Sequence, residues 1–526
     1  MVNNSQRVIR DRARSILNEM GFGPQASTAH ELSSIAFHSH CLFRWKDRIM
    51  KVRLIFCFTV AAVLLALLFT GCGGSVAGGR SNNPVGGGNN NAPGGGGNNT
   101  TPGGTRHMQI GVNLWNINWD GWQNYFKSGV DWTKETDPWN PTFLADLAQV
   151  NGPIRFMDFD EANSNVIVDW KDRIQKTEDQ YKATNPCHAI QTPDVAKPYL
   201  PTGTTTSYHC GIAYEWMIDL CNRTGRDMWI TVPTFSSPDY WTQLATLIKN
   251  NLDPKLKVYV EYSNETWNWI SLARDYSMAM GAQMHIPDAP HDVVSANPSQ
   301  WYVGPAWSVW QSLNVFKAFV DVFGADNTGL DKRLVRVIAF SENADRTARV
   351  PIGNIVFNGA PNDGETPDLT LNATWNPHKM VPDMLAIAPY IGPSDNTDPN
   401  YADIDGAAPD AQTKFHGDIV DGMAHAWRDY RAIGTLYNIP MGTYEGGNQL
   451  SKNADVFNLS PAIYDEYTFF LDQIDTLGLV MFNHYTLYGS YDGNTAWGLK
   501  QNANTADTKA ASPKWQAIKD WLATHK

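Results

Sequence analysis

Residues 257–269 read KVYVEYSNETWNW, in which β-branched and aromatic residues dominate up to Tyr262 and the polar run Ser263-Asn264-Glu265 follows. A short run of this composition predicts a buried strand that ends where the polar residues begin. Seven more segments have the same character, and most are followed by a longer amphipathic stretch. The eight expected strands are residues 110–114, 154–159, 228–233, 257–263, 334–340, 384–389, 440–444 and 479–484.

Helical segments are expected between these strands. Strands that alternate with helices favour parallel pairing, and eight repeats favour a closed barrel over an open sheet. The expected fold is therefore α/β, a (β/α)8 TIM barrel. A doubly wound nucleotide-binding fold would need a glycine-rich turn after its first strand, but residues 115–119 read WNINW. The expected helices are residues 141–150, 213–224, 240–251, 307–323, 418–437 and 461–476.

Long polar loops follow several of the strands. They account for the excess of chain length over the roughly 250 residues typical of such a barrel. Loops after the strands lie on the catalytic face of this fold, so we expect them to build a substrate cleft. They are residues 172–211, 285–306, 341–378 and 392–416.

The beginning of the chain predicts export. An apolar run at residues 54–70 follows the basic start at residues 50–53 and ends at Thr70-Gly71-Cys72, the pattern of a signal peptide. The ending Phe-Thr-Gly-Cys resembles a bacterial lipobox, which implies lipidation of Cys72 and contact with a membrane only through that lipid. A membrane-spanning signal anchor is the alternative, although a span needs about 20 apolar residues.

These features divide the chain into four parts. Met50 resembles a natural translation start, so residues 1–49 are expected to be an unstructured upstream extension and residues 50–72 the lipoprotein signal peptide. Gly, Asn and Pro dominate residues 73–107, a composition typical of a flexible tether. Residues 108–526 are expected to form one catalytic domain, either anchored at a membrane or extracellular.

The composition narrows the class of partner. The 526 residues carry a net charge of −12, which argues against nucleic acid because phosphate binding needs a Lys/Arg surface. Trp, Tyr and Phe number 20, 20 and 21, and their faces suit sugar rings, although each can equally belong to the core. Cys187 and Cys210 could close the first long loop with a disulfide, and Cys221 is expected to be a buried thiol.

Two glutamates follow expected strands directly. Glu265 lies in the segment quoted above, just after its strand, and Glu445 lies in IPMGTYEGG, residues 439–447, after the seventh strand. The ends of parallel strands meet at one face of a barrel, so both carboxylates are expected to point into the same mouth. Glycosidic bond cleavage needs such a pair, one to protonate the leaving oxygen and one to attack the anomeric carbon or activate water.

Asn-Glu at the end of the fourth strand and Glu at the end of the seventh resemble clan A glycoside hydrolases, which are retaining (β/α)8 enzymes. The longer forms VYVEYSNETWN and TYEGG also resemble secreted bacterial proteins of that clan described as glycosidases or cellulose-binding. The resemblance covers residues 108–526. It implies Glu265 as acid/base, Asn264 as a contact to the substrate 2-hydroxyl, and Glu445 as nucleophile.

Two more positions match the clan. Arg155 stands where the clan has an arginine that keeps the nucleophile ionised, and Tyr390 where it has a tyrosine that hydrogen-bonds the nucleophile. Many families of the clan carry a His before that tyrosine, whereas this chain has Pro389, which puts the narrower family in doubt. The resemblance implies a polysaccharide or oligosaccharide substrate and requires no cofactor and no metal.

Aromatic residues near strand ends are candidate sugar platforms: Trp115, Trp267 and Trp497. Two alternatives concern the acidic residues. Glu261 shares strand parity with Glu265 and is expected to be structural, with a buried partner to offset its desolvation. Glu445 could instead be a structural partner of Arg155. A non-catalytic carbohydrate-binding surface lipoprotein on the same barrel is the alternative function.

Overall fold

The computed structural model describes residues 107–114, 122–128, 134–157, 159–176, 187–268, 271–286, 300–341, 344–362, 364–392, 404–450, 452–491 and 496–526. The expectations for residues 1–106, including the signal peptide, the tether and lipidation of Cys72, lie outside these residues. The candidate platform Trp115 also lies outside them. Among the described residues, no helix is long and apolar enough to cross a membrane.

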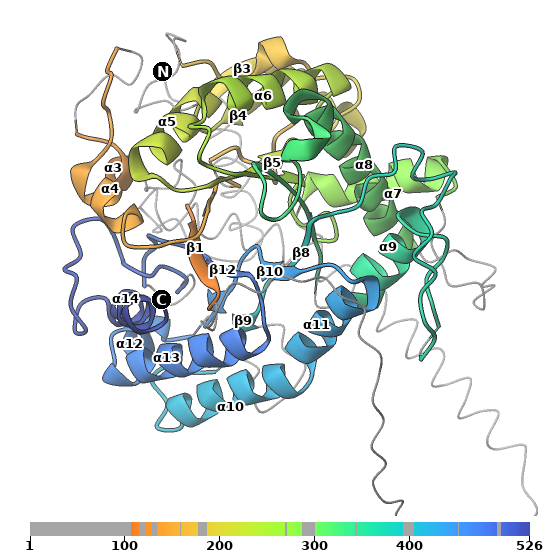
Figure 1. Ribbon diagram of the computed structural model, residues 1–526. Helices are drawn as coiled ribbons and strands as arrows, with labels where there is room; N and C mark the ends of the chain where they lie inside the picture. The colour runs from red at the N-terminus through yellow and green to blue at the C-terminus, as the bar shows by residue number, and fades with distance from the viewer. Residues whose placement is uncertain are drawn as a thin grey trace, which may run out of the picture. The chain divides into compact units, whose positions relative to one another are not determined.

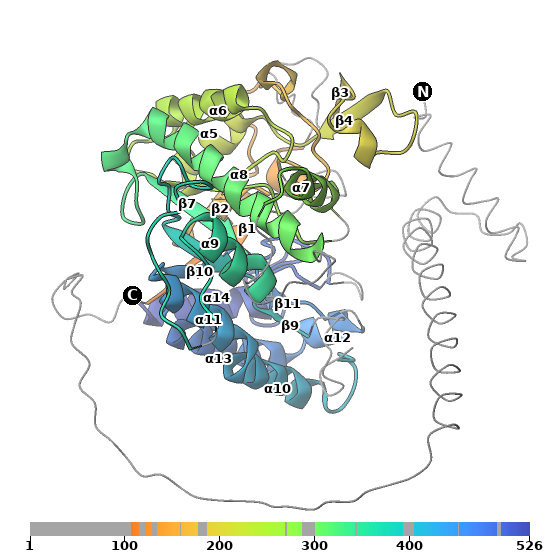
Figure 2. The same cartoon turned by 90° about the vertical axis from the view of Figure 1, so that its right-hand side faces the viewer.

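Eight parallel strands form one sheet that curls into a barrel (Figures 1 and 2). β1 and the last strand pair in register, with Gln109 opposite Met481. Across the remaining seam the Val480 N–H donates to the Met441 carbonyl at 2.8 Å, so the barrel is nearly closed. The order around the barrel is β1 (Gln109–Asn113), β2 (Ile154–Arg155), β5 (Met228–Val232), β6 (Val258–Tyr262), β7 (Leu334–Ala339), β8 (Met384–Ile387), β10 (Met441–Thr443) and β12 (Met481–His484).

These eight strands coincide with the eight expected from the sequence, and the (β/α)8 barrel is confirmed. The largest difference is at β2, expected to reach residue 159. It ends at Arg155 because the chain then turns, with the Asp160 N–H donating to the Phe156 carbonyl at 3.0 Å. Glu265 and Glu445 therefore follow the fourth and seventh strands of the barrel, β6 and β10.

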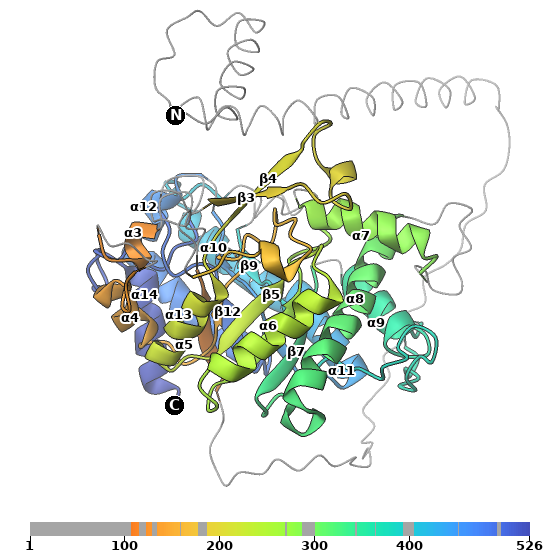
Figure 3. The ribbon, with the colours of Figure 1, turned by 90° about the horizontal axis from the view of Figure 1, so that it is seen from above.

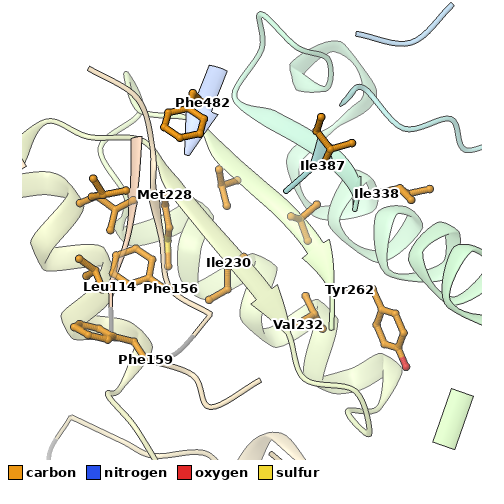
Figure 4. Packing of buried hydrophobic residues seen from close by; sticks show 14 of the residues in the cluster. Leu114, Phe156, Phe159, Met228, Ile230, Val232, Tyr262, Ile338, Ile387 and Phe482 are labelled. Atoms are coloured by element: carbon orange, nitrogen blue, oxygen red, sulfur yellow. The ribbon is translucent and has the colours of Figure 1, made fainter. Parts of the chain in front are cut away.

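Side chains alternate between the two faces of the barrel wall. On β5, Met228, Ile230 and Val232 point outward and pack with the helices in the main core (Figure 4), while Trp229 points inward. This period of two follows from the strand geometry. The inward set forms a second apolar cluster that fills the barrel: Trp229, Tyr259, Val335, Val337, Met384, Ala386, Tyr444 and Met481.

Helices surround the barrel (Figure 3). Several begin at a capping residue followed by proline at the first position, where the missing N–H costs nothing: Asn140 before α4 and Ser237 before α6. The helices are α3 (Trp122–Tyr125), α4 (Pro141–Leu147), α5 (Tyr214–Thr224), α6 (Pro238–Asn251), α7 (Leu272–Gln283), α8 (Gln300–Phe323), α9 (Val350–Ile355), α10 (Ala411–Ala424), α11 (Ala426–Tyr437), α12 (Ala454–Asn458), α13 (Pro461–Thr476) and α14 (Pro513–Thr524).

Two expected helices and one expected loop were wrong in detail. The single helix expected at 418–437 is two helices, because His425 leaves the helical conformation with φ −128° and ψ −90°. The helix expected from residue 307 begins seven residues earlier, with Pro305 inside it. Residues 300–306 therefore belong to α8 and not to the loop expected there.

The first long loop carries a hairpin, β3 (Cys187–Gln191) with β4 (Thr206–Cys210), which stands away from the barrel (Figures 2 and 3). Its antiparallel register places Cys187 opposite Cys210. The side chains of these two cysteines lie outside the described part, so the expected disulfide stays a prediction. Cys221 is a buried free thiol, as expected, and burial raises its pKa.

Candidate active site

The structure gathers five of the sequence-derived site residues at the carboxyl ends of the barrel strands: Arg155, Asn264, Glu265, Tyr390 and Glu445. Arg155 is the last residue of β2 and points into the barrel. Glu265 follows β6 by three residues, and Glu445 follows β10 by two. Tyr390 begins β9 (Tyr390–Ile391), a short strand beyond β8.

Arg155 is the centre of this cluster. Its Nη1 donates to Glu445 Oε1 at 2.8 Å and to Asn113 Oδ1 at 3.1 Å. Its Nη2 donates to Asn264 Oδ1 at 2.7 Å and to Glu261 Oε1 at 3.1 Å, while Nε donates to Glu261 Oε2 at 3.0 Å. Arg155 is fully buried, so these acceptors replace all of its water. One guanidinium thereby holds Glu445 and the residue next to Glu265 in the same site.

Electrostatics fix the charge of this guanidinium. Burial alone would lower the pKa of Arg155, but the carboxylates of Glu261 and Glu445 outweigh burial and raise it above its ordinary value. The aromatic faces of Trp229 and Tyr444 lie 5.7 and 5.1 Å from its Cζ and add further attraction. Arg155 is therefore a permanent cation beside Glu445.

Glu261 is the bidentate partner of Arg155, and it is 2% exposed. The Trp229 Nε1–H also donates to its Oε2 at 2.8 Å. Burial raises the pKa of the Glu261 carboxyl, while Arg155 and Trp229 oppose that rise. The partner that a buried Glu261 requires is thus present, and both of its oxygens are occupied by protein groups.

Glu445 is 4% exposed and holds protein donors on both oxygens. Arg155 occupies Oε1, and the Tyr390 hydroxyl donates to Oε2 at 2.7 Å. Burial and the neighbouring Glu445 charge raise the pKa of Tyr390, so this hydroxyl keeps its proton and remains a donor. A two-strand ladder, β9 with β11 (Gly447–Asn448), aligns Tyr390 with Gly447 and fixes this contact.

The two glycines of the TYEGG segment are required by the backbone. Gly446 and Gly447 have φ of 145° and 119°, in the region that favours glycine. A Cβ on Gly447 would lie 2.5 Å from His484 Nε2 on β12. The chain can therefore turn directly after Glu445 and return along β9 only with glycine at these positions.

Glu265 has different surroundings. The Tyr444 hydroxyl donates to its Oε1 at 2.7 Å, and Asn268 Nδ2 donates to its Oε2 at 2.8 Å. Both donors are neutral, and within the described residues no Lys, Arg or His forms an ion pair with Glu265. Ser263 and Glu265 themselves adopt positive φ, 60° and 39°, which is strained for residues with a side chain and turns Glu265 off the line of β6.

Asn264 is almost fully buried, and protein groups occupy its amide. Its Oδ1 accepts from Arg155, and its Nδ2 donates to Asn163 Oδ1 at 3.0 Å. A hydrogen bond from Asn264 Nδ2 to a substrate hydroxyl would have to share or replace the one to Asn163, which comes from the turn after β2.

Two of the candidate platforms are half-buried at this end of the barrel. Trp497 packs edge-on against Tyr485, with ring centroids 5.5 Å apart, in a small cluster that includes Met157 and Tyr390. Trp267 packs against Tyr444 at 6.3 Å. Trp267 and Glu265 also line a hollow that reaches to α8, with Thr266, Ser308, Ser312 and Thr347 supplying hydroxyl groups.

The sequence reading did not identify three residues of this cluster: Tyr444, Asn268 and Asn113. Tyr444 had a usable signal, because it directly precedes Glu445 at the end of a strand. Asn268 lies three residues after Glu265, a spacing typical of a local turn. Asn113 ends β1 and lies opposite Arg155 on the paired strand β2, so the register of these two strands brings them together. Among the described residues, no group of three or more His, Cys, Asp or Glu is placed to hold a metal ion.

Comparisons with known proteins give no family model and no curated protein that matches this chain. Solved structures do resemble it. A GH51 arabinofuranosidase from Xanthomonas axonopodis pv. citri has 12% identity and a TM-score of 0.43, covering 79% of this chain and 72% of its own. A GH5-4 broad specificity endoglucanase from an uncultured bacterium has 14% identity and a TM-score of 0.35, covering 78% and 94%.

An alpha-L-arabinofuranosidase from Thermotoga maritima has 10% identity and a TM-score of 0.42, with coverage of 79% of this chain and 69% of its own. The structural neighbours are thus glycoside hydrolases. At these identities and TM-scores they assign neither a substrate nor a catalytic residue to this chain.

Proposed function

We propose that this chain is a retaining glycoside hydrolase that cleaves β-glycosidic bonds in a polysaccharide or oligosaccharide. Glu445 is the nucleophile and Glu265 the acid/base. The observation that carries the proposal is the asymmetry between two clustered carboxylates. Glu445 binds the buried cation of Arg155, while Glu265 binds two neutral donors. Pairs of carboxyl groups in unequal environments are suited to take the two unequal parts in glycoside hydrolysis.

The first half of the reaction needs an ionised nucleophile. Arg155 and the Tyr390 hydroxyl both stabilise negative charge on Glu445. A Glu445 oxygen attacks the anomeric carbon, the bond from that carbon to the leaving oxygen breaks, and Glu265 gives its proton to the leaving oxygen. The products of this step are a covalent glycosyl ester on Glu445, an ionised Glu265 and the free alcohol.

The second half reverses the part of Glu265. As a carboxylate it removes a proton from water, the water oxygen bonds to the anomeric carbon, and the ester bond to Glu445 breaks. Tyr444 and Asn268 already donate to Glu265 in the geometry that stabilises its ionised form. Retention of the anomeric configuration follows from two successive inversions.

Substrate binding is assigned to the residues around this pair. Asn264 would bind the 2-hydroxyl, and Trp267, Trp497 and Trp115 would present aromatic faces to sugar rings. Preference for a β-linkage is inferred from the resemblance to clan A. Export and a lipid anchor at Cys72, with residues 73–107 as a tether, would place the barrel at a membrane surface within reach of polysaccharide.

The direct test measures hydrolysis and binding on the same proteins. The full chain, Glu445→Gln and Glu265→Gln are each assayed against a panel of polysaccharides and nitrophenyl β-glycosides. The proposal expects the wild type to hydrolyse at least one member and both variants to lose that activity while retaining binding. A wild type that binds a glycan and hydrolyses none would instead identify a carbohydrate-binding lipoprotein.

A further inference from the structure

Tyr444 lies between the two carboxylates. It follows β10, immediately before Glu445, and is almost fully buried. Its hydroxyl donates to Glu265 Oε1 at 2.7 Å, and its ring lies 5.1 Å from the Arg155 Cζ. Trp267 packs edge-on against the same ring, which limits its movement. Tyr444 therefore contacts both the proposed acid/base, Glu265, and Arg155, the cation that binds the proposed nucleophile.

Tyrosines contact each carboxylate in a parallel way. Tyr390 donates to Glu445, and Tyr444 donates to Glu265, both at 2.7 Å. Burial raises the pKa of both tyrosines, so both hydroxyls remain protonated over the working range of an enzyme. A neutral tyrosine hydroxyl thus donates to each of the two carboxylates. Of the two, Glu445 also binds the cation of Arg155.

Among the residues that the structure describes, none forms an ion pair with Glu265, so its hydrogen bonds are decisive. The charged groups near Glu265 include Glu261 on β6, Arg155 on β2 and Glu445 after β10, and the Arg155 nitrogens are bound to those two carboxylates, Asn264 and Asn113. Arg274 on α7 lies beside Trp267 and forms an ion pair with Asp275. What stabilises a negative charge on Glu265 is then the pair of neutral donors, Tyr444 and Asn268.

We propose that Tyr444 is a positioning residue that orients Glu265 and stabilises its ionised form through this hydrogen bond. The inference rests on the proposed function and extends it to a residue outside the pair. A hydroxyl suits this position because it donates to ionised Glu265 and keeps its own proton while it does so. The Asn268 amide nitrogen donates to the other oxygen of Glu265, so each carboxylate oxygen has a neutral donor.

The test is the pH profile of kcat/KM for Tyr444→Phe and Tyr390→Phe in the full chain. The substrate is a nitrophenyl β-glycoside that the wild type hydrolyses. Loss of the Tyr444 donor disfavours ionised Glu265, so the basic limb should move to higher pH by about one unit. Loss of the Tyr390 donor disfavours ionised Glu445, so in that variant the acidic limb should move to higher pH instead.

A purely structural Tyr444 would lower activity equally at every pH, and an unmoved basic limb in a folded variant overturns the inference. If Tyr444→Phe does not fold, Asn268→Ala removes the other donor to Glu265, and it must move the same limb in the same direction. If the basic limb of Tyr444→Phe does not move but Glu265→Gln is inactive, the role proposed for Tyr444 is wrong and the proposed function still stands. A wild type without hydrolase activity overturns both the proposed function and this inference.

Discussion

The site around Glu445, the proposed nucleophile, and the site around Glu265, the proposed acid/base, differ in how they hold a carboxylate. Around Glu445 the protein places a buried guanidinium and a tyrosine, and two glycines with positive φ let the backbone turn away. Around Glu265 it places two neutral donors, and Glu265 itself carries the positive φ. The same side chain is thus placed in two unequal environments by its neighbours, one with a buried cation and one with neutral donors.

Arg155 adds a second contrast, between two carboxylates that share one cation. Glu261 takes two of its N–H groups, and both Glu261 oxygens accept from protein donors. Glu445 takes one N–H group. We infer that the contact with Glu261 holds the Arg155 guanidinium in place and stabilises the fold. The contact of Arg155 with Glu445 would serve the activity.

The largest expected effect is on catalysis and differs between the two sides. Glu445→Gln should lower kcat by about 10⁴-fold or more on every substrate, because no other group can form the covalent intermediate. Glu265→Gln should lower kcat/KM by about 10²- to 10⁴-fold on substrates with poor leaving groups, and far less on dinitrophenyl glycosides, which need no proton. Equal losses for both variants on both substrates would contradict the division of parts.

The next effect is on stability, where we expect Glu261 to matter more than Glu445. Glu261→Gln should lower the free energy of unfolding by about 3–5 kcal/mol, because it breaks the bidentate buried ion pair with Arg155. Glu445→Gln should cost less, since Arg155 keeps Glu261. Denaturant unfolding of the two variants measures the difference. A Glu445→Gln variant that is the less stable of the two would refute the assignment of Glu261 as the structural partner.

A smaller effect concerns the proposed sugar platform Trp497. Lys514 on α14 is fully buried, and its Nζ donates to the Ala496 carbonyl at 2.6 Å and to the Trp497 carbonyl at 3.4 Å. Lys514→Met should loosen this loop and raise KM by about tenfold with kcat little changed. Lys509→Met, at a half-exposed lysine over Tyr464, is the matched control and should leave KM unchanged.

The smallest effect is on the pH dependence of stability and concerns a third carboxyl, that of Asp160. Among the described residues this carboxyl has one donor and no cationic partner. Asp160 is buried, the Tyr214 hydroxyl donates to its Oδ1 at 3.0 Å, and burial raises its pKa well above the ordinary value. A raised acid contributes stability below its unfolded pKa, about 3.9, and loses that contribution as the pH rises through the folded value. Asp160→Asn should therefore become more stable relative to wild type as pH increases, by about 1–2 kcal/mol in thermal or urea unfolding. A difference that stays constant with pH would mean that Asp160 does not titrate as its burial requires.

The sequence predicted the barrel well because strand composition is local. Each of the eight strands is a short β-branched and aromatic run, and the alternation of inward and outward residues survives in the structure, as at Met228, Trp229 and Ile230. Helix ends were less predictable. The break at His425 depends on how α10 and α11 pack, and no residue there forbids a continuous helix.

The sequence predicted the site residues that belong to a recognisable motif. It did not predict the contacts that depend on strand register and on how side chains meet across the barrel. Glu265, Glu445, Arg155 and Tyr390 follow strands and match a known pattern, and they do lie together. The link from Arg155 to Asn113 depends on the register of β1 with β2, and the link from Tyr444 to Glu265 spans 179 residues. Such contacts depend on side-chain direction across the barrel, which local composition does not determine.

The most direct test of the two assigned carboxylates is to trap the covalent intermediate. The full chain is incubated with a series of 2-deoxy-2-fluoro β-glycosides that carry a dinitrophenyl leaving group, digested, and the labelled residue is located by mass spectrometry. We predict a single glycosyl ester on Glu445, and no label in Glu445→Gln. A label on Glu265 or Glu261, or a first-formed product of inverted anomeric configuration, would contradict the account.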